Sequence, residues 1–425
     1  MTTRALAAAT LAAAVALAAG WTMAPSGVRP LPPSVCSPLV HGKGTPDLLI
    51  VSDLPLQGAR ARPAVQMAAA IRFVLARHAF RAGKYSLAYQ SCDDANLQTG
   101  AGDLGRCVAN AKAYAANSGV IGVIGTWSSR CSEFELPILN RARGGPLAIV
   151  SPSNTNIGLT RAAPGTQPGE PGRYYPTRKR NFVRLIAPDD AQGAAAALLV
   201  KQLRAKSVYV LDDKEDYGFS VDTTFRHAAA KLGLKLVGSA FWDPDASDFT
   251  ALAQQVARAH PAAVYLAGFG CAACAELLKA LRGALGRGPL LVAPDGWMPL
   301  PTVIRAAGSA AEGLYVSALG TTAGKLGRAA SPIVRRFGGP VPGGGGPPYA
   351  AQAAEVLLAA IARSNGTRGS VTSELFRVKV RNGILGSFGF DKNGDTTAPA
   401  VTFYRARGGK QVVARVITPP PRLIR

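Results

Sequence analysis

Small hydroxyl and amide side chains follow two apolar runs in the first half of the chain. The runs cover residues 120–124 and 147–150, and the polar loops behind them contain Trp127, Ser128, Ser129, Ser153, Asn154 and Thr155. The hydroxyls could be plain helix N-caps, or they could hold an anion together with backbone N–H groups at helix starts. These groups suit the binding of a small polar ligand better than bond chemistry. Gln57, in the loop after an earlier apolar run at 48–51, is counted with them as a candidate binding residue.

Two candidates in the second half of the chain offer a carboxylate and a phenol. Asp295 follows the apolar run 290–292, where it could be a turn or cap residue or a ligand group that faces a cleft. Tyr217 precedes a helical segment at 219–232, where it could pack at the helix start or contact a ligand. We predict the ligand role for both.

Motifs of the common enzyme classes are missing from the sequence. It contains no G-x-S-x-G, no H-E-x-x-H, no Walker loop and no G-x-G-x-x-G. The four histidines lie in a linker or on predicted helices, where surface or packing roles are expected. We therefore expect no catalytic residue, no metal and no cofactor.

Two short motifs have both a functional and a structural interpretation. Cys271 and Cys274 form a C-x-x-C pair at a helix start, where thiol pKa values fall, but we predict a structural disulfide; zinc would need two further ligands. The segment 391–395, Asp-Lys-Asn-Gly-Asp, resembles the start of a calcium loop. Such a loop needs a glutamate at its twelfth position, and Thr402 is there instead, so the Asn-Gly pair predicts a turn.

Six cysteines in a chain with an apparent export signal suggest disulfides. Six cysteines allow 15 connectivities. Cys92 and Cys107 bracket a polar loop and favour a local bridge, and Cys271 and Cys274 favour another. The remaining pair would then be Cys36 with Cys131, which ties the N-terminal arm to the helix after the second strand loop.

The composition indicates a globular, exported protein. The chain has 425 residues, 48% of them hydrophobic, which is enough for two or three domains. Its formal net charge is +23, but the basic residues are spread along the chain without a basic helix interleaved with aromatics, so we expect no nucleic-acid partner. Arg4 and the apolar stretch 5–19 predict a signal peptide at 1–24 and an extracytoplasmic location.

Short apolar strands alternate with helix-period segments through most of the chain. This pattern predicts an α/β protein with two doubly wound, open-sheet lobes and ligands at the carboxyl ends of the strands. An arm at 25–46 precedes lobe 1, which spans 47–180. Lobe 2 spans 181–312, and the strand 313–317 is expected to return to lobe 1, which would then continue to residue 390. The last part, 391–425, is expected to hold C-terminal strands in lobe 2 or the hinge, and a tail.

Several segments together resemble the Leu/Ile/Val-binding protein family, the type I periplasmic substrate-binding components of ABC importers. The resemblance covers about residues 47–405. The segments that carry it are 121–129, 149–155, 212–218, 268–270, 294–296 and 389–395. The family fold implies two lobes joined by three crossing segments, with the ligand in the cleft between them.

The resemblance also implies roles for single residues. The hydroxyl and amide group of Ser128, Ser129, Ser153, Asn154 and Thr155 would grip an amino-acid α-carboxylate. Tyr217 would lie beside the ligand amine, and Asp295 would pair with the ammonium. Asp295 is one methylene shorter than the family glutamate, and Phe269 stands where the family often has a tyrosine. Ser153-Asn154 replaces two small apolar residues, which makes the pocket more polar.

These expectations define a solute-binding protein. It would capture a small polar ligand, most simply an amino acid or a related compound, by hinge closure and deliver it to an ABC transporter permease. We expect it to act as a monomer. The alternative is a ligand-sensing domain that acts through a separate signalling partner, and an enzyme is the third possibility, which would need a nucleophile–base pair or metal cluster.

Overall fold

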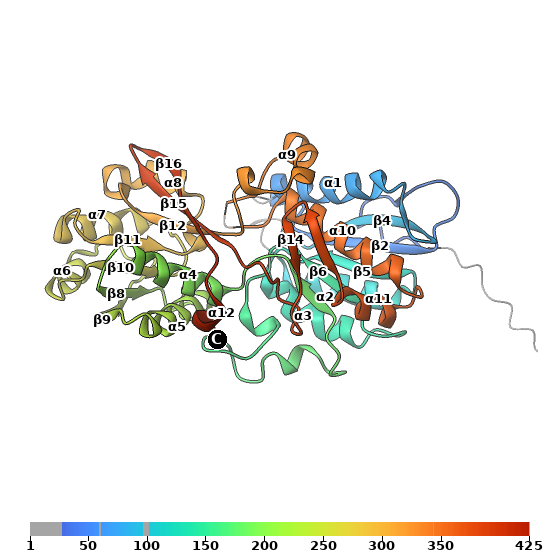
Figure 1. Ribbon diagram of the computed structural model, residues 1–425, viewed down its shortest axis with the longest axis horizontal. Helices are drawn as coiled ribbons and strands as arrows, with labels where there is room; N and C mark the ends of the chain where they lie inside the picture. The colour runs from blue at the N-terminus through green and yellow to red at the C-terminus, as the bar shows by residue number, and fades with distance from the viewer. Residues whose placement is uncertain (1–27, 59–60, 97–101, 343, 425) are drawn as a thin grey trace, which may run out of the picture.

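The computed structural model describes residues 28–58, 61–96, 102–342 and 344–424. The predicted signal peptide at 1–24 and the first residues of the predicted arm lie outside the described residues. Figure 1 shows two α/β lobes side by side along the long axis of the molecule. The prediction of two α/β lobes with open, mainly parallel sheets is confirmed.

Lobe 1 is built on a sheet with the strand order β1-β4-β2-β5-β6-β7. Its strands are β1 Val40–His41, β2 Leu48–Leu54, β3 Arg81–Ala82, β4 Tyr85–Asp93, β5 Val120–Gly125, β6 Ala148–Ser151 and β7 Phe182–Arg184. The pairs from β4 through β7 are parallel, while β1 and β3 join β4 antiparallel. Every residue of β2 and β5 is buried, as expected for central strands covered on both faces.

Helices cover both faces of this sheet. On one face lie α1 Ala61–Arg77, α9 Ser331–Phe337, α10 Pro347–Arg363 and α11 Arg368–Leu375; on the other lie α2 Leu104–Ala116 and α3 Ser129–Asn140. Successive residues of β2 point to opposite faces of the sheet. Ile50 packs in the hydrophobic core beneath the first group of helices, and Leu49 packs in the core beneath the second group. A small hairpin of β13 Lys379–Gly383 and β14 Gly386–Gly389 also packs on lobe 1.

Lobe 2 repeats the arrangement with the strand order β16-β15-β12-β11-β10-β8-β9. Its strands are β8 Ser207–Asp212, β9 Lys235–Phe241, β10 Ala263–Ala267, β11 Leu290–Ala293, β12 Tyr315–Leu319, β15 Val401–Arg407 and β16 Lys410–Ile417. One face is covered by α4 Asp189–Gln202, α5 Asp216–Lys231 and α12 Pro421–Ile424, and the other by α6 Thr250–Arg258, α7 Cys274–Leu285 and α8 Leu300–Ala307.

The predicted strand at 313–317 does not return to lobe 1. It is β12, which runs parallel to β11 and antiparallel to β15 within the lobe 2 sheet. All residues of β12 are buried, so this strand needs neighbours on both edges, and only lobe 2 supplies them. The chain therefore leaves lobe 2 after Leu319, and the crossings between lobes fall near residues 185–188, 320–330 and 390–400.

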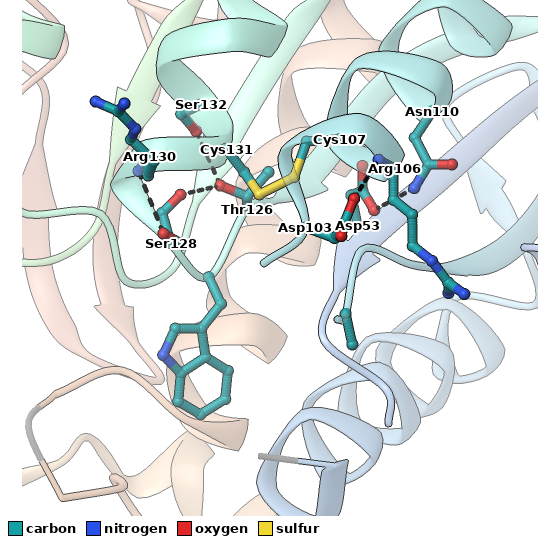
Figure 2. Close-up of a disulfide and its surroundings, with 12 residues drawn as sticks. Asp53, Asp103, Arg106, Cys107, Asn110, Thr126, Ser128, Arg130, Cys131 and Ser132 are labelled. Atoms are coloured by element: carbon teal, nitrogen blue, oxygen red, sulfur yellow. Dashed lines mark hydrogen bonds between the residues drawn. A yellow bond between two sulfur atoms is a disulfide. The ribbon is translucent and has the colours of Figure 1, made fainter. Parts of the chain in front are cut away.

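Two of the three predicted disulfide pairings are wrong. The bridges join Cys36 to Cys92, Cys107 to Cys131, and Cys271 to Cys274, so only the last pair was predicted correctly. The arm runs antiparallel beside β4, which brings the Cα atoms of Cys36 and Cys92 to 3.9 Å. Helices α2 and α3 pack against each other and place Cys107 opposite Cys131 (Figure 2).

Candidate ligand-binding site

A cavity of about 390 Å³ lies between the lobes, where the carboxyl ends of strands from both sheets meet. Side chains of both lobes line it: Trp127, Ser128, Ser129, Arg130, Glu133, Thr155, Asn156, Gln167, Glu170 and Arg173 from lobe 1, and Asp189, Glu215, Asp216, Tyr217, Ser220, Phe269 and Asp295 from lobe 2. This is the position at which open α/β sheets bind ligands. A hollow of similar volume beside Cys271 and Cys274 belongs to lobe 2 alone.

Seven of the ten sequence-predicted binding residues line the interlobe cavity. They are Trp127, Ser128, Ser129, Thr155, Tyr217, Phe269 and Asp295. Gln57, Ser153 and Asn154 are not among the lining residues. Gln57 Nε2 donates a hydrogen bond of 2.6 Å to Asp93 Oδ2, away from the cavity.

Ser153 and Asn154 support the loop that precedes α3. Asn154 Nδ2 donates to the carbonyl oxygens of Thr126 and Trp127 at 3.0 and 3.1 Å, and its Oδ1 accepts from Ser132 Oγ at 2.6 Å. Ser153 Oγ donates to the carbonyl of Trp127 at 3.1 Å. The two side chains therefore stabilise the backbone of the loop that forms the lobe 1 wall, without lining the cavity themselves.

The lobe 1 wall is centred on the start of α3. Ser128 is the N-cap of this helix, and its Oγ accepts from the N–H of Arg130 at 3.2 Å (Figure 2). Ser129 Oγ accepts from the N–H groups of Thr155 and Asn156 at 3.1 and 3.2 Å, which ties the two polar loops together. Because a serine hydroxyl has one proton of its own, Ser129 is left with a donor for a ligand oxygen.

The lobe 2 wall is centred on Asp295. Tyr217 Oη donates to Asp295 Oδ1, and Gln192 Nε2, from α4, donates to the same oxygen at 2.7 Å. Burial raises the pKa of Asp295, and the hydrogen bonds from Tyr217 and Gln192 offset part of this rise. Phe269 stacks beside Tyr217 with a centroid distance of 4.5 Å, and its side chain is half exposed toward the cavity.

Sequence reasoning missed Asp189, the first residue of α4. It is buried, it lines the cavity, and its Oδ1 has no hydrogen-bond partner. Burial, together with the nearby charge of Asp295, raises the pKa of Asp189 to about 7. The signal in the sequence is the run Pro188-Asp189-Asp190, which follows β7 and the first crossing segment.

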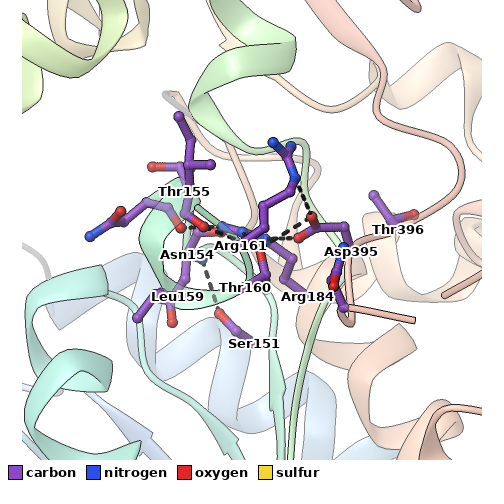
Figure 3. Close-up of polar contacts among 12 residues, drawn as sticks. Ser151, Asn154, Thr155, Leu159, Thr160, Arg161, Arg184, Asp395 and Thr396 are labelled. Atoms are coloured by element: carbon purple, nitrogen blue, oxygen red, sulfur yellow. Dashed lines mark hydrogen bonds and ion pairs between the residues drawn. The ribbon is translucent and has the colours of Figure 1, made fainter. Parts of the chain in front are cut away.

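A buried ionic network lies beside the cavity, where crossing segments meet (Figure 3). Arg184 is fully buried, and its Nε pairs with Asp395 Oδ1 at 2.7 Å. Arg161 pairs with Asp190 and, at 3.2 Å, with Asp395 Oδ2. Burial alone would raise the pKa of Asp395, but the charges of Arg184 and Arg161 outweigh it and hold that pKa below its ordinary value.

The predicted turn at 391–395 is what brings Asp395 into this network. Asp391 Oδ1 accepts from the N–H groups of Asn393 and Asp395, which closes the turn. Gly394 has a φ of +96°, and a Cβ there would lie 2.1 Å from the carbonyl oxygen of Phe182. Only glycine lets the third crossing lie this close to β7.

Two α/β lobes, joined by three crossings and separated by a polar cavity, define a protein that binds a solute between its lobes. The sequence profile of the periplasmic binding protein family matches residues 54–411, and the chain belongs to this family. The members of this family are solute-binding proteins and not enzymes. Within the described residues no helix is long and apolar enough to cross a membrane.

Solved structures of ABC transporter binding proteins share this fold. The leucine-binding protein LivK from Thermotoga maritima is 22% identical, with 88% of this chain and 99% of that chain covered and a TM-score of 0.67. A substrate-binding protein from Desulfitobacterium hafniense is 20% identical, with 86% and 99% covered and a TM-score of 0.69. A solute-binding protein from R. palustris in complex with 4-hydroxybenzoate is 14% identical, with 88% and 98% covered and a TM-score of 0.66. No match was found among curated proteins.

Proposed function

We propose that the protein captures an amino acid or a closely related amino compound outside the cytoplasm and delivers it to the permease of an ABC importer. The observation that carries this proposal is the placement of Asp295. Its carboxyl is half-buried, held by Tyr217 and Gln192, and lies on the wall of the cavity opposite the hydroxyls of lobe 1. A ligand ammonium would compensate the charge of this half-buried carboxylate.

The lobe 1 wall has the complementary chemistry. Ser129 keeps a proton to donate, and Ser128 and Thr155 place further hydroxyls beside it. The N-terminus of α3 adds a partial positive charge at this wall. A ligand carboxylate would be bound here, so a zwitterion would bridge the two lobes.

The similar structures represent two ligand classes. One relative is a leucine-binding protein, and another is in complex with 4-hydroxybenzoate. A benzoate has no cation to pair with a carboxylate. The carboxyl of Asp295 on the cavity wall therefore favours the aminated class for this chain.

A thermal-shift screen followed by calorimetry tests the proposal. Each amino acid is compared with its desamino analogue, for example L-leucine with 4-methylpentanoate. A ligand at 100 times its dissociation constant adds about 2.7 kcal/mol of stability. We expect at least one amino acid to stabilise the protein and its desamino analogue to fail. Tight binding of benzoates or desamino acids, with no response to any amino acid, would contradict the proposal.

The variant Asp295→Asn tests the residue assignment. Removing the charge that pairs with a buried ammonium costs about 2–5 kcal/mol, so affinity should fall about 30-fold or more. Gln57→Ala, outside the cavity, is the control and should leave the affinity unchanged. Near-wild-type affinity of Asp295→Asn for an amino acid would exclude the ammonium role.

A further inference from the structure

The cavity is acidic although the protein is strongly basic. The chain carries a formal net charge of +23. The cavity is lined by two arginines, Arg130 and Arg173, but by six carboxyl side chains: Glu133, Glu170, Asp189, Glu215, Asp216 and Asp295. A site whose sign opposes that of the whole molecule cannot be explained by overall composition.

The two arginines do not compensate this excess, because both already have partners on lobe 1. Arg173 Nη2 pairs with Glu170 Oε1 at 2.7 Å, and Arg130 Nη1 pairs with Glu133 Oε2 at 3.4 Å. The four remaining carboxyls all lie on lobe 2. Among the described residues no arginine or lysine forms a salt bridge with Asp189 or Asp295.

Among the lobe 2 carboxyls that line the cavity, Asp189 is the strongest candidate for contact with a ligand cation. Its side chain is 3% exposed and its Oδ1 has no hydrogen-bond partner, while the backbone N–H of Asp189 donates to the carbonyl of Thr155 across the lobe boundary. Asp295 already provides one carboxyl for an α-ammonium. Asp189 is therefore a second carboxyl on the same wall, more deeply buried than Asp295, and its Oδ1 still lacks a donor.

Favourable interactions with helix dipoles explain part of the excess of carboxyl groups in the cavity. Glu215 and Asp216 are exposed and lie at the start of α5, where acidic residues interact favourably with the helix dipole. Asp189 opens α4 and gains from the same effect. The helix dipole does not require Asp189 to be buried at a cavity wall beside Asp295, and the mutual repulsion of the two neighbouring carboxylates opposes that arrangement.

Aromatic side chains add to the cation-binding character. Trp127 from lobe 1 and Tyr217 and Phe269 from lobe 2 line the same cavity. The faces of such rings attract cations and pack well against alkyl stems. Carboxyls and aromatic rings together are the groups that recognise an alkylammonium or a guanidinium.

We propose that the site takes amino compounds with two cationic groups, that is, diamino or guanidino amino acids, and that Asp189 recognises the second cation. This inference rests on the proposed function and names its substrate class. The α-carboxylate would meet the hydroxyls of lobe 1, and the two cations would meet the acidic wall of lobe 2. The raised pKa of Asp189 agrees with this view, since a bound cation would stabilise the ionised form of the carboxyl, which burial disfavours.

Matched ligand pairs test the inference by isothermal calorimetry on the full mature chain. L-lysine is compared with L-norleucine, which lacks only the terminal amine, and L-arginine with its neutral isostere L-citrulline. In at least one pair we expect the cationic member to bind about tenfold more tightly or better, which corresponds to about 1.4 kcal/mol. Equal or tighter binding of the neutral member in both pairs would overturn the inference.

Two variants assign the effect to Asp189. Asp189→Asn should reduce the preference for the cationic member about tenfold. Glu276→Gln, an exposed carboxyl of lobe 2 outside the cavity, should change it less than about twofold at physiological salt. An unchanged preference in Asp189→Asn would overturn the role of this residue. Thermal unfolding of both variants checks that they are folded.

The result also separates this inference from the proposed function. If L-norleucine or L-leucine binds well and the basic amino acids do not, the amino-acid assignment stands and the dicationic class is wrong. If only desamino carboxylates bind, both are wrong.

Discussion

Burial raises the pKa of several carboxyl groups in this molecule, and two pairs of them differ in what they face. Asp189 and Asp295 face the interlobe cavity, whereas Asp53 and Glu135 face the interior of lobe 1. Burial raises the pKa of Asp53 to about 7. Burial and the neighbouring charge of Asp53 raise the pKa of Glu135 well above its ordinary value. This pair therefore keeps its protons to higher pH than the same groups do in the unfolded chain.

The interior pair predicts a stability that falls as pH rises. In the unfolded chain these groups titrate near their ordinary pKa values of 3.8 and 4.5. The folded protein therefore holds more protons between about pH 5 and 7, and the free energy of unfolding falls by about 1.4 kcal/mol per pH unit for each extra proton. The contribution is fully present below the ordinary values and is lost as pH rises through the raised ones.

The variant Glu135→Gln tests this effect, because an amide stays neutral at every pH. We expect a smaller loss of unfolding free energy between about pH 5.5 and 8.5 than in the wild type, measured by urea denaturation. Glu215→Gln changes the net charge equally at an exposed site and should keep the wild-type profile. Parallel pH profiles for wild type and Glu135→Gln would contradict the prediction.

At the scale of elements, the first and third crossings are joined by one buried ion pair. Arg184 ends β7 and Asp395 follows the turn at 391–395 (Figure 3). Arg184 also donates to the carbonyl of Asn156 at 2.7 Å, so it holds the polar loop of lobe 1 as well. The network therefore holds the two crossing segments and this cavity loop in fixed positions relative to one another.

Asp395→Asn should therefore destabilise the whole protein. The substitution leaves Arg184 buried without its counter-charge and removes one of the two carboxylates that pair with Arg161. Breaking a buried ion pair in this way costs about 3–5 kcal/mol. Urea denaturation measures the change. Glu276→Gln, which breaks the exposed pair with Lys279, should cost less than about 1 kcal/mol. A similarly small cost for Asp395→Asn would mean that the pair does not support the hinge.

The sequence predicted the elements well because strands and helices leave a local pattern. The apolar run 120–124 and the helical segment 219–232 were predicted correctly as a strand, β5, and a helix, α5, since periodicity and burial are linked within each element. The disulfide partners and the place of β12 depend on which elements become neighbours. The position of the arm beside β4 and the contact of α2 with α3 are features of the tertiary structure. Sequence spacing does not contain them, so it predicted the wrong cysteine pairs.

The residues of the candidate site also fall into those that a local sequence pattern predicts and those that depend on tertiary packing. Ser129, Tyr217 and Asp295 lie directly after strands, where the topology of an α/β sheet places ligand groups, and all three line the cavity. Asp189 follows a crossing segment and comes near Asp295 only because α4 packs beside β12 in lobe 2. Ser153 and Asn154 lie in the predicted loop, but their side chains turn toward the backbone of Thr126 and Trp127.

At the scale of the whole molecule, the two walls offer different chemistry and neither is complete alone. Lobe 1 presents hydroxyls and internally paired arginines, while the cavity carboxyls of lobe 2 form no salt bridge within the described part of the chain. A ligand can shift a conformational equilibrium only by its difference in affinity for the two states. A ligand that carries both a carboxylate and an ammonium gains contacts in the closed state that one wall cannot give.

This division predicts that closure depends on both ends of the ligand. Small-angle X-ray scattering should show a smaller radius of gyration when the protein is saturated with its amino-acid ligand than without ligand, because the lobes approach each other. The amine that lacks the α-carboxylate, such as cadaverine for lysine or isoamylamine for leucine, pairs only with the lobe 2 wall. At equal occupancy it should leave the radius of gyration near the ligand-free value. If the amine compacts the protein as much as the amino acid does, the acidic wall alone drives closure, and the hydroxyls of Ser128 and Ser129 have no part in it.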